Sequence, residues 1–483
     1  MDTSRVFHHF YEISKIPRGS GNEKGISNYL VNFAKVHGLE VIQDEYYNVL
    51  IRKKATKGYE KYKSICLQGH MDMVCEKDEN KVFDFKKDPI EIIIQDGYLT
   101  ANGTTLGADN GISVAICMAI LESDKIKHPD LEILLTTDEE VGMVGAKGFD
   151  ITNLESNILV NIDSEEYGCI YVSSAGSSMV KSSKTFNAQK IEKDVYEVKI
   201  DGLFGGHSGV DIHLNTANAS MLLAELMLKL ANVAEVNILD FNGGTKDNTI
   251  PRSAKIVFST DMEYKELEKL LNVFLDSLRY RYIKAEKNIL MSISKLKDIE
   301  YTLMLNKEDS KNLLNYLMNM PNGVLKMSDN SKDLVESSSN MGIVYTEEIN
   351  GKKLINTHNA IRSLKIEYQD YVAECIKEYA KSFGFDAIVK KSYNPWEYKE
   401  KSEIRDYFSQ IFENQVGYKP RILKMHAGLE TGLFAEKNDK LDIISIGPDI
   451  KNPHTPSEKM SIEAVEQTYV YLVSALENYN IVK

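Results

Sequence analysis

Three short apolar segments of this chain each lead into side chains that can bind a metal ion. Residues 64–68 lead to His70, residues 131–136 to Glu139 and Glu140, and residues 157–162 to Asp163. Residues 112–121 are almost wholly apolar and are predicted to form a buried helix. Strand–helix alternation with continuously apolar strands predicts a largely parallel sheet covered on both faces. Sites form beyond the carboxyl ends of such strands, so these side chains are expected to meet.

Length and composition restrict the class of protein. A chain of 483 residues is too long for one ordinary core, which favours two or three domains. Hydrophobic and charged contents of 43% and 27% are typical of a soluble globular protein. A net charge of −13 argues against a nucleic-acid partner, which would need a basic surface. The sequence has no apolar run of about 18 residues, so no membrane partner is expected.

The cysteines predict a reducing compartment. There are five, they are widely scattered, and no Cys-x-x-Cys pair occurs. Cys66 and Cys117 lie within apolar runs and are expected to be buried and reduced. The first 21 residues lack the apolar core of a signal peptide. Together these features predict a cytoplasmic protein without disulfides.

The pattern of predicted elements changes near residue 187. The segments 195–200, 216–230, 236–241, 254–260, 264–285 and 289–296 follow a β-α-β-β-α-β order, the split arrangement of ferredoxin-like folds. A second unit of this kind is predicted from helices at 307–318 and 368–383 and strands at 324–327, 334–346, 353–358 and 387–391. We therefore expect domain segments at 1–186, 187–393 and 394–483.

The fifth candidate ligand, His454, follows a predicted strand at 443–446 and lies 291 residues after Asp163. One site can use both residues only if the middle region is an insertion in the first domain, which proteins tolerate where chain ends lie close together. The expected fold class is thus α/β. A catalytic domain with a mainly parallel sheet (1–186 and 394–483) would carry an inserted α+β lid domain of ferredoxin-like units (187–393).

His70 and Asp72 form a His-x-Asp pair at the end of the first apolar segment. A metal-bound imidazole needs an acceptor on its other nitrogen, and an acid two residues along an extended chain points to the same side. We assign His70 as a ligand and Asp72 as its partner. A lone pair of this kind is weak evidence, because a histidine at the end of a strand often contacts only water.

The acidic segments supply the remaining predicted roles. Asp109 can bridge two cations about 3.5–4 Å apart, although an aspartate here could equally cap the helix that follows. Adjacent side chains diverge, so Glu140 can bind metal while Glu139 accepts a proton from the attacking water. A solvated acidic turn is the alternative for this pair. Asp163 and His454 complete two sets that share Asp109: His70 with Asp163, and Glu140 with His454.

The ligand chemistry indicates the metal. Two imidazoles and several carboxylates, without a thiolate, suit zinc in an open hydrolytic site, and also manganese or cobalt. The expected cofactor is therefore two divalent ions per chain, Zn²⁺ or alternatively Mn²⁺ or Co²⁺.

Five ordered motifs carry a family resemblance that runs nearly end to end. They are Gly-His-Met-Asp-Met-Val (69–74), Leu-Gly-Ala-Asp-Asn-Gly (106–111), Thr-Asp-Glu-Glu-Val-Gly (137–142), Asn-Ile-Asp-Ser-Glu (161–165) and Pro-His-Thr-Pro-Ser-Glu (453–458). The segments 16–18, 205–209, 211–213 and 426–430 extend it. The chain resembles the co-catalytic zinc exopeptidases, and among them the aminoacyl-histidine dipeptidases, also called Xaa-His or β-alanyl-histidine dipeptidases.

The resemblance implies roles for three residues of the inserted region. His207 would stabilise the tetrahedral oxyanion, and Arg362 would bind the C-terminal carboxylate of a dipeptide in a bidentate manner. Asn248 would contact the substrate. The alternatives are a hinge-loop histidine, a surface arginine and a turn residue. The sequence departs from the family pattern at Thr431, where Cys is common, and at residues 214–216, which could alter substrate preference.

The expected function is that of a cytosolic dinuclear metallodipeptidase, acting on unblocked dipeptides that include Xaa-His. Water bridging the metals would attack the amide carbonyl, with Glu139 as general base. A related amidase, such as an N-acyl amino acid deacylase or an aminotripeptidase, is one alternative, and a non-catalytic binding module is another. The expected partner is a small peptide substrate, and the expected assembly is a monomer or homodimer.

Overall fold

The computed structural model describes the chain except residues 1–2, 298–300, 330 and 332. It divides into two compact units. Unit 1 comprises Met1–Ser174, Trp396–Lys424 and Leu429–Lys483, and unit 2 comprises Ala175–Pro395 and Met425–Gly428. Unit 1 is thus assembled from segments on both sides of unit 2 in the sequence.

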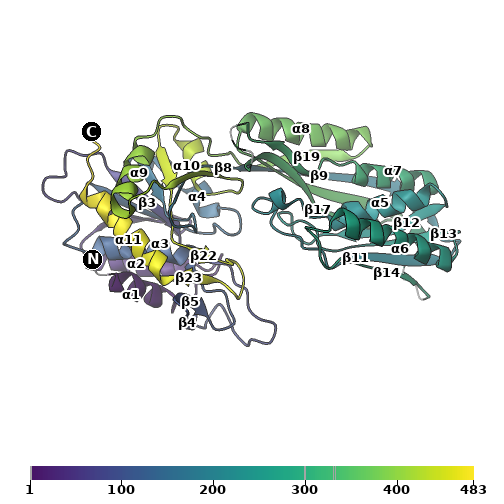
Figure 1. Ribbon diagram of the computed structural model, residues 1–483, viewed down its shortest axis with the longest axis horizontal. Helices are drawn as coiled ribbons and strands as arrows, with labels where there is room; N and C mark the ends of the chain where they lie inside the picture. Colours follow the sequence, from purple (N-terminus) through teal and green to yellow (C-terminus); the bar gives the residue numbers. More distant parts are fainter. Residues whose placement is uncertain (1–2, 298–300, 330, 332) are drawn as a thin grey trace. The chain divides into compact units, whose positions relative to one another are not determined.

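The described residues of unit 1 form an eight-stranded sheet (Figure 1). Its strands, in spatial order, are β1 (Glu40–Gln43), β2 (Val49–Lys53), β6 (Leu131–Thr136), β3 (Ile65–His70), β7 (Ile158–Asn161), β21 (Asp442–Ser445), β8 (Cys169–Ser174) and β20 (Arg421–Met425). The central run β6-β3-β7-β21 is parallel, and β1, β2 and β8 pair antiparallel. Every residue of β3, β6 and β7 is buried, which explains why these strands are mostly apolar. The predicted parallel sheet is confirmed.

Helices cover the sheet of unit 1. They are α1 (Ser4–Ile13), α2 (Lys24–Val36), α3 (Ala108–Glu122), α4 (Val144–Gly148), α9 (Glu403–Val416), α10 (Thr431–Lys437) and α11 (Ile462–Glu477), with a short 3₁₀ helix at Ile151–Asn153. Helix α3 packs on β3 and lies between α1 and α11, so nearly all of its residues are buried. The predicted buried helix is therefore present.

A four-stranded sheet joins the two sequence halves of unit 1. It consists of β22 (Ile450–Lys451), β23 (Lys459–Ser461), β5 (Tyr98–Ala101) and β4 (Ile92–Gln95), in that order. Strand β23 pairs antiparallel with β5. This pairing anchors the turn between β22 and β23, which contains His454, to the N-terminal half of the unit.

Unit 2 contains an antiparallel sheet of nine strands within its described residues. Its strands are β14 (Leu290–Lys295), β11 (Val195–Asp201), β13 (Ala254–Thr260), β12 (Val236–Gly243), β17 (Val335–Ile349), β18 (Lys352–Ser363), β9 (Gly176–Asn187) and β19 (Asp386–Tyr393), with β16 (Gly323–Met327) pairing β17. Strands β10 (Gln189–Lys190) and β15 (Leu303–Met304) form a separate pair.

The described residues of unit 2 form four α-helices: α5 (Ala219–Ala231), α6 (Tyr264–Arg281), α7 (Lys307–Met318) and α8 (Ile366–Ser382), with a 3₁₀ helix at Ile212–Leu214. Helix α8 lies along β9 and β19 (Figure 1). The order β11-α5-β12-β13-α6-β14 matches the predicted β-α-β-β-α-β pattern. Helix α5 begins at Ala219, later than predicted, because the Asn218 side chain accepts hydrogen bonds from the first-turn amides of Ser220 and Met221.

Strand β9 was not predicted. Its residues 176–187 precede the expected boundary at 187, yet they pair with β18 and β19 in the sheet of unit 2. Serines, including Ser178 and Ser182, occupy buried positions of β9, which hides the alternation of the strand in a hydrophobicity pattern.

The cysteines agree with the compositional analysis. All five cysteines are free thiols, and Cys66 and Cys117 are buried, as predicted. Within the described part of the chain, no helix is both long enough and apolar enough to cross a membrane.

Candidate metal centre

Unit 1 gathers the five predicted metal ligands at the carboxyl edge of its parallel strands. His70 is the last residue of β3, Glu140 follows β6, and Asp163 follows β7. Asp109 lies in the first turn of α3, and His454 lies in the turn after β22. Ligand atoms of His70, Asp109 and Glu140 lie within 4.8 Å of one another, a grouping that could hold a metal ion.

The two carboxylate oxygens of Asp109 face one histidine each. Oδ1 lies 3.1 Å from His70 Nε2, and Oδ2 lies 3.0 Å from His454 Nε2. His70 Nε2 is also 3.6 Å from Asp163 Oδ1, and His454 Nε2 is 3.0 Å from Glu140 Oε2. Each oxygen of Asp109 therefore faces one imidazole, and each of these imidazoles lies near one further carboxylate. Helix capping does not describe this carboxylate, because both of its oxygens face imidazoles.

The electrostatics of these residues fit a bound cation. Asp163 Oδ1 and Glu140 Oε1 are buried and have no hydrogen-bond partner among the described residues. Burial raises the pKa of Asp163 well above its usual value and also raises the pKa of Glu140, and the charge of Asp109 adds to both. Burial lowers the pKa of His454, but hydrogen bonds to Asp109 and Glu140 outweigh it and raise that pKa to about 11. Buried carboxylates with unused oxygens are suited to metal coordination.

Asp72 contacts more of the site than the sequence indicated. It is fully buried, and its Oδ1 lies 3.3 Å from His70 Nδ1, as the predicted partner of that ring should. The same carboxylate accepts hydrogen bonds from the backbone N–H of Glu139 (3.1 Å) and of Glu140 (3.3 Å), and from Ser20 Oγ (2.8 Å). Asp72 therefore orients both the imidazole and the turn that carries the two glutamates.

Glu139 lies in that turn, next to Glu140 along the chain. Burial raises the pKa of Glu139 well above its usual range, and the negative charges of Glu140, Glu430 and Asp72 raise it further. His70 opposes this shift. A carboxyl group in such surroundings binds protons more readily than a solvated one.

Sequence reasoning gave no role to Glu430, a glutamate that is fully buried. Its Oε2 accepts hydrogen bonds from Gln68 Nε2 and Thr136 Oγ1, both at 2.6 Å, on strands β3 and β6. Gln68 in turn accepts from Asn161 Nδ2 on β7 at 2.6 Å. Burial raises the pKa of Glu430 to about 7. The segment 426–430 carries part of the family resemblance, but no local pattern in it indicates that Glu430 is buried against β3 and β6.

Three more residues near the site were missed as well. Arg18 and Glu458 are buried beside the loop that carries Asp109, and Glu165 interacts with Asp109 itself. All three fall within a motif of the sequence, Arg18 in 16–18, Glu165 in 161–165 and Glu458 in 453–458, which was the available signal.

The three predicted residues of the inserted region lie together in unit 2. Arg362 Nη2 is 3.3 Å from His207 Nε2, and Arg362 Nη1 donates to the Tyr393 hydroxyl at 3.3 Å. Arg362 is only 7% exposed, so it is not a surface arginine. The Asn248 carbonyl accepts a hydrogen bond from Ser208 N at 2.8 Å, next to His207, while Asn248 itself is exposed.

The ring of His207 has a defined orientation. Its Nδ1 accepts hydrogen bonds from the backbone N–H of Gly209 (3.3 Å) and of Val210 (3.1 Å). A neutral imidazole whose Nδ1 accepts carries its proton on Nε2. In this structure Nε2 faces Arg362 Nη2 at 3.3 Å, and a guanidinium only donates, so Nε2 can donate to another group once that contact is released.

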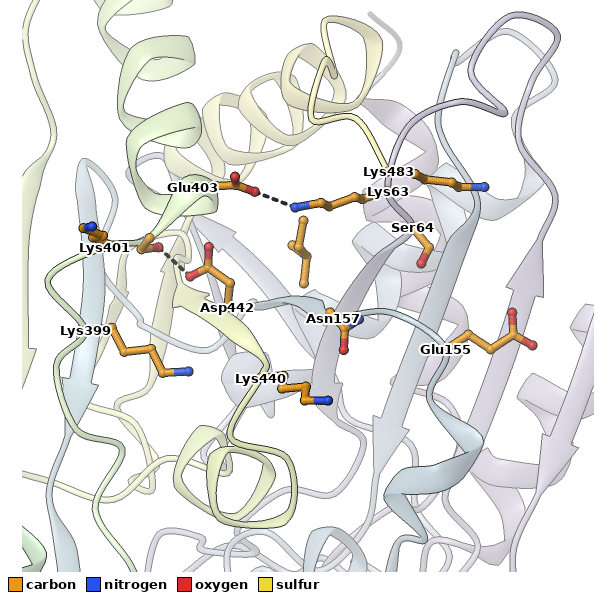
Figure 2. A pocket seen from close by; sticks show the side chains of 12 residues that line it. Lys63, Ser64, Glu155, Asn157, Lys399, Lys401, Glu403, Lys440, Asp442 and Lys483 are labelled. Carbon is orange, nitrogen blue, oxygen red and sulfur yellow. Dashed lines mark hydrogen bonds and ion pairs between the residues drawn. The ribbon is translucent and has the colours of Figure 1, made fainter.

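A cavity of about 720 Å³ elsewhere in unit 1 shares no residue with the metal ligands. Figure 2 shows its lining, which includes Lys63 paired with Glu403 at 2.7 Å. Ser64, Asn157 and Asp442 lie in it, at the amino ends of β3, β7 and β21. The candidate metal ligands His70 and Asp163 lie at the opposite, carboxyl ends of β3 and β7.

Comparisons with known proteins agree with this geometry. Residues 66–478 match the model of peptidase family M20/M25/M40. The chain is 36% identical over 471 residues to the cytosol non-specific dipeptidase of Escherichia coli (strain K12). This alignment covers 97% of this chain and 96% of that protein. The crystal structure of aminoacylhistidine dipeptidase from Vibrio alginolyticus aligns with a TM-score of 0.82 and 34% identity, covering 100% and 99% of the two chains. The aminopeptidase PepT from Bacillus cereus shares the fold, with a TM-score of 0.60 and 17% identity over 99% and 98%.

Proposed function

This chain belongs to peptidase family M20/M25/M40 and is a metallodipeptidase, and we propose that it removes the N-terminal residue of unblocked dipeptides at a centre of two divalent metal ions. The observation that carries this proposal is the placement of Asp109, whose two oxygens lie 3.1 Å and 3.0 Å from the imidazoles of His70 and His454. A carboxylate with one ligand set on each oxygen is suited to bridge two cations.

The ligand sets follow from these contacts. His70 and Asp163 would hold one ion, Glu140 and His454 the other, and Asp109 both. We propose Zn²⁺, with Mn²⁺ or Co²⁺ as alternatives, because the donors are nitrogen and oxygen atoms only. When bound, such ions polarise the amide carbonyl and lower the pKa of the attacking water.

We assign the proton transfers to Glu139. It would accept the proton of the attacking water and pass it to the leaving amine. Two observations support assigning metal binding to Glu140 and proton transfer to Glu139. The carboxylate of Glu140 lies beside His454, and Asp72 accepts from the backbone N–H of both glutamates, which holds the backbone from which the two side chains diverge.

We propose that His207, Arg362 and Asn248 act on the bound substrate. His207 Nε2 would donate to the oxyanion, and the orientation of its ring supports this role. Arg362 would bind the terminal carboxylate, and its burial favours a strong bidentate contact. Under this proposal residues 187–393 act as the lid of a catalytic domain formed by 1–186 and 394–483.

The names of the relatives support the substrate class. The Escherichia coli protein is called a non-specific dipeptidase of the cytosol, and the Vibrio alginolyticus protein an aminoacylhistidine dipeptidase. We therefore propose dipeptides including Xaa-His as substrates. The predicted cytoplasmic location agrees with the name of the first relative.

The substrate proposal is tested with a panel of Xaa-His dipeptides, other dipeptides, tripeptides and N-acetyl amino acids. Metal-loaded protein should hydrolyse free dipeptides in preference to the rest. Preferred hydrolysis of N-acetyl amino acids would instead identify a deacylase, and preferred hydrolysis of tripeptides an aminotripeptidase.

The mechanism is tested with Glu139→Gln, which keeps the shape of the side chain but cannot accept a proton. We expect kcat to fall about 10²–10⁴-fold with two ions still bound per chain. Glu155→Gln, at an exposed glutamate of unit 1, is the matched control and should behave as wild type. If Glu139→Gln keeps full activity or loses its metals, the assignment of the two glutamates is wrong.

A further inference from the structure

Arg18 is a buried arginine that the proposed mechanism leaves without a role. It is 2% exposed. Its Nη1 donates to the carbonyls of Met71 (3.1 Å) and Asp72 (3.2 Å), just after His70, and its Nη2 donates to the carbonyl of Gly107 (2.5 Å). One guanidinium thus ties the segment of His70 to the loop that leads into Asp109.

Glu458 holds the same loop through its amide groups. It is also 2% exposed, and it follows His454 by four residues. Its carboxylate accepts four backbone N–H groups: Oε2 from Leu106 (2.7 Å) and Gly107 (2.9 Å), and Oε1 from Ala108 (2.8 Å) and Asp109 (3.2 Å). Glu458 therefore ties the segment of His454 to the loop that carries Asp109.

Two glycines make room for the guanidinium. A Cβ atom at Gly107 would lie 2.6 Å from Arg18 Nη2, and one at Gly111 would lie 2.4 Å from the same nitrogen. Both distances are shorter than a contact between these atoms allows. The glycines of the motif at 106–111 are thus required by the position of Arg18.

The two charged groups act on opposite sides of one residue. Gly107 donates its N–H to Glu458 and accepts at its carbonyl from Arg18. Burying a guanidinium and a carboxylate is unfavourable unless their hydrogen bonds are satisfied, and removing either group takes the favourable opposite charge away from the other. Such an arrangement fixes its backbone more firmly than neutral hydrogen bonds do.

We propose that Arg18 and Glu458 are positioning residues of the metal centre. They form a clamp, defined by these two side chains and the Gly107 backbone, that holds Asp109 between His70 and His454 so that one carboxylate can bridge two ions. The inference rests on the proposed two-metal function. Partners of metal ligands typically change metal affinity about 10–100-fold when they are removed.

Three variants test the clamp. Glu458→Gln replaces one acceptor oxygen with an NH₂ group that faces backbone N–H donors. Arg18→Met removes the guanidinium. Gly111→Ala keeps both charges and displaces the guanidinium through its added Cβ, so it decides the question if the other two variants do not fold.

Glu132→Gln is the matched control. Glu132 is also buried and accepts backbone N–H groups, from Glu155 (3.0 Å) and Ser156 (2.7 Å). It lies on β6 four residues before the end of the strand at Thr136, about 13 Å from the edge that carries the ligands. It therefore reports the cost of the same chemical change away from the metal centre.

The readouts are ions bound per chain, metal affinity in competition with a chelator, and the Tm of the metal-free protein. We expect the clamp variants to bind at least one ion about 10–100-fold more weakly than wild type. Glu132→Gln should lower Tm only. Wild-type metal affinity in Glu458→Gln and Gly111→Ala, or an equal loss in Glu132→Gln, would overturn the clamp.

The wild-type measurement separates this inference from the proposed function. If the wild-type protein binds one ion at saturating metal, the bridging role of Asp109 is wrong. The comparison of each variant with wild type still decides whether Arg18 and Glu458 position the ligands.

Discussion

His426 predicts a pH dependence of stability that can be isolated with one substitution. In unit 2 its Nε2 lies 2.8 Å from Ser338 Oγ, and its ring is buried. Burial, with the charges of Arg362 and His213, lowers the pKa of His426 to about 3, although the nearby backbone of Val335 opposes the shift. The native protein therefore keeps this imidazole neutral.

The sign follows from proton binding. A histidine in the unfolded chain has a pKa of 6.5. Between that pH and about pH 3 the unfolded state binds a proton that the native state does not, so the free energy of unfolding falls as the pH is lowered. A pH of 5 lies about 1.5 units below the pKa of this histidine in the unfolded chain. Protonation of the unfolded state therefore lowers the free energy of unfolding at pH 5 by about 2 kcal/mol from this residue alone.

The perturbation is His426→Gln, which stays neutral and retains a partner for Ser338. Hydrogen-exchange protection of the β17 and β18 amides, measured on metal-free protein at pH 8 and pH 5, reports the stability of unit 2. Wild type should lose about 2 kcal/mol more than the variant between the two pH values. Exposed His37→Gln in unit 1 is the control and should follow wild type. Equal losses in wild type and His426→Gln would refute the neutral, buried histidine.

Two further predictions concern the substrate clamp and the packing beneath the metal centre. Arg362→Ala should raise KM strongly for dipeptides and far less for the same peptides with an amidated C-terminus; equal effects in steady-state kinetics would show that Arg362 supports the fold instead. Gly69→Ala should lower Tm and metal content together, because its Cβ would lie 2.0 Å from Ser113 Oγ, whereas Gly25→Ala, with its nearest neighbour at 3.5 Å, should leave both nearly unchanged in calorimetry and elemental analysis.

The positions of the proposed ligands could be predicted because each depends on a local pattern. His70, Glu140 and Asp163 follow apolar runs, and parallel strands end at a common edge of the sheet, so the sequence order alone indicates that these side chains meet. Ile443 and its neighbours gave the same signal for β21, which pairs in parallel with β7 and precedes the segment of His454.

The supporting residues were not predictable in this way. Glu458 binds backbone amides about 350 residues away in sequence, and Arg18 binds carbonyls in two separate loops. A glutamate or arginine in a loop has the same local pattern whether it is solvated or buried against distant backbone. Glu430 differs from a surface glutamate only through Gln68 and Thr136, which lie on strands that precede it by about 300 residues or more.

The order of strands β7-β21-β8 has a consequence for synthesis of the chain. Strands β7 and β8 emerge from the ribosome close together, but the strand that lies between them, Asp442–Ser445, is made only after the whole of residues 175–395. Until then the edge of β7 that faces β21 has no partner, and exposed strand edges are prone to aggregation. His454 is translated later still, so under the proposed ligand sets the metal centre is completed only on a nearly full-length chain. A chain that stalls earlier carries His70 and the proposed acidic ligands without the second imidazole.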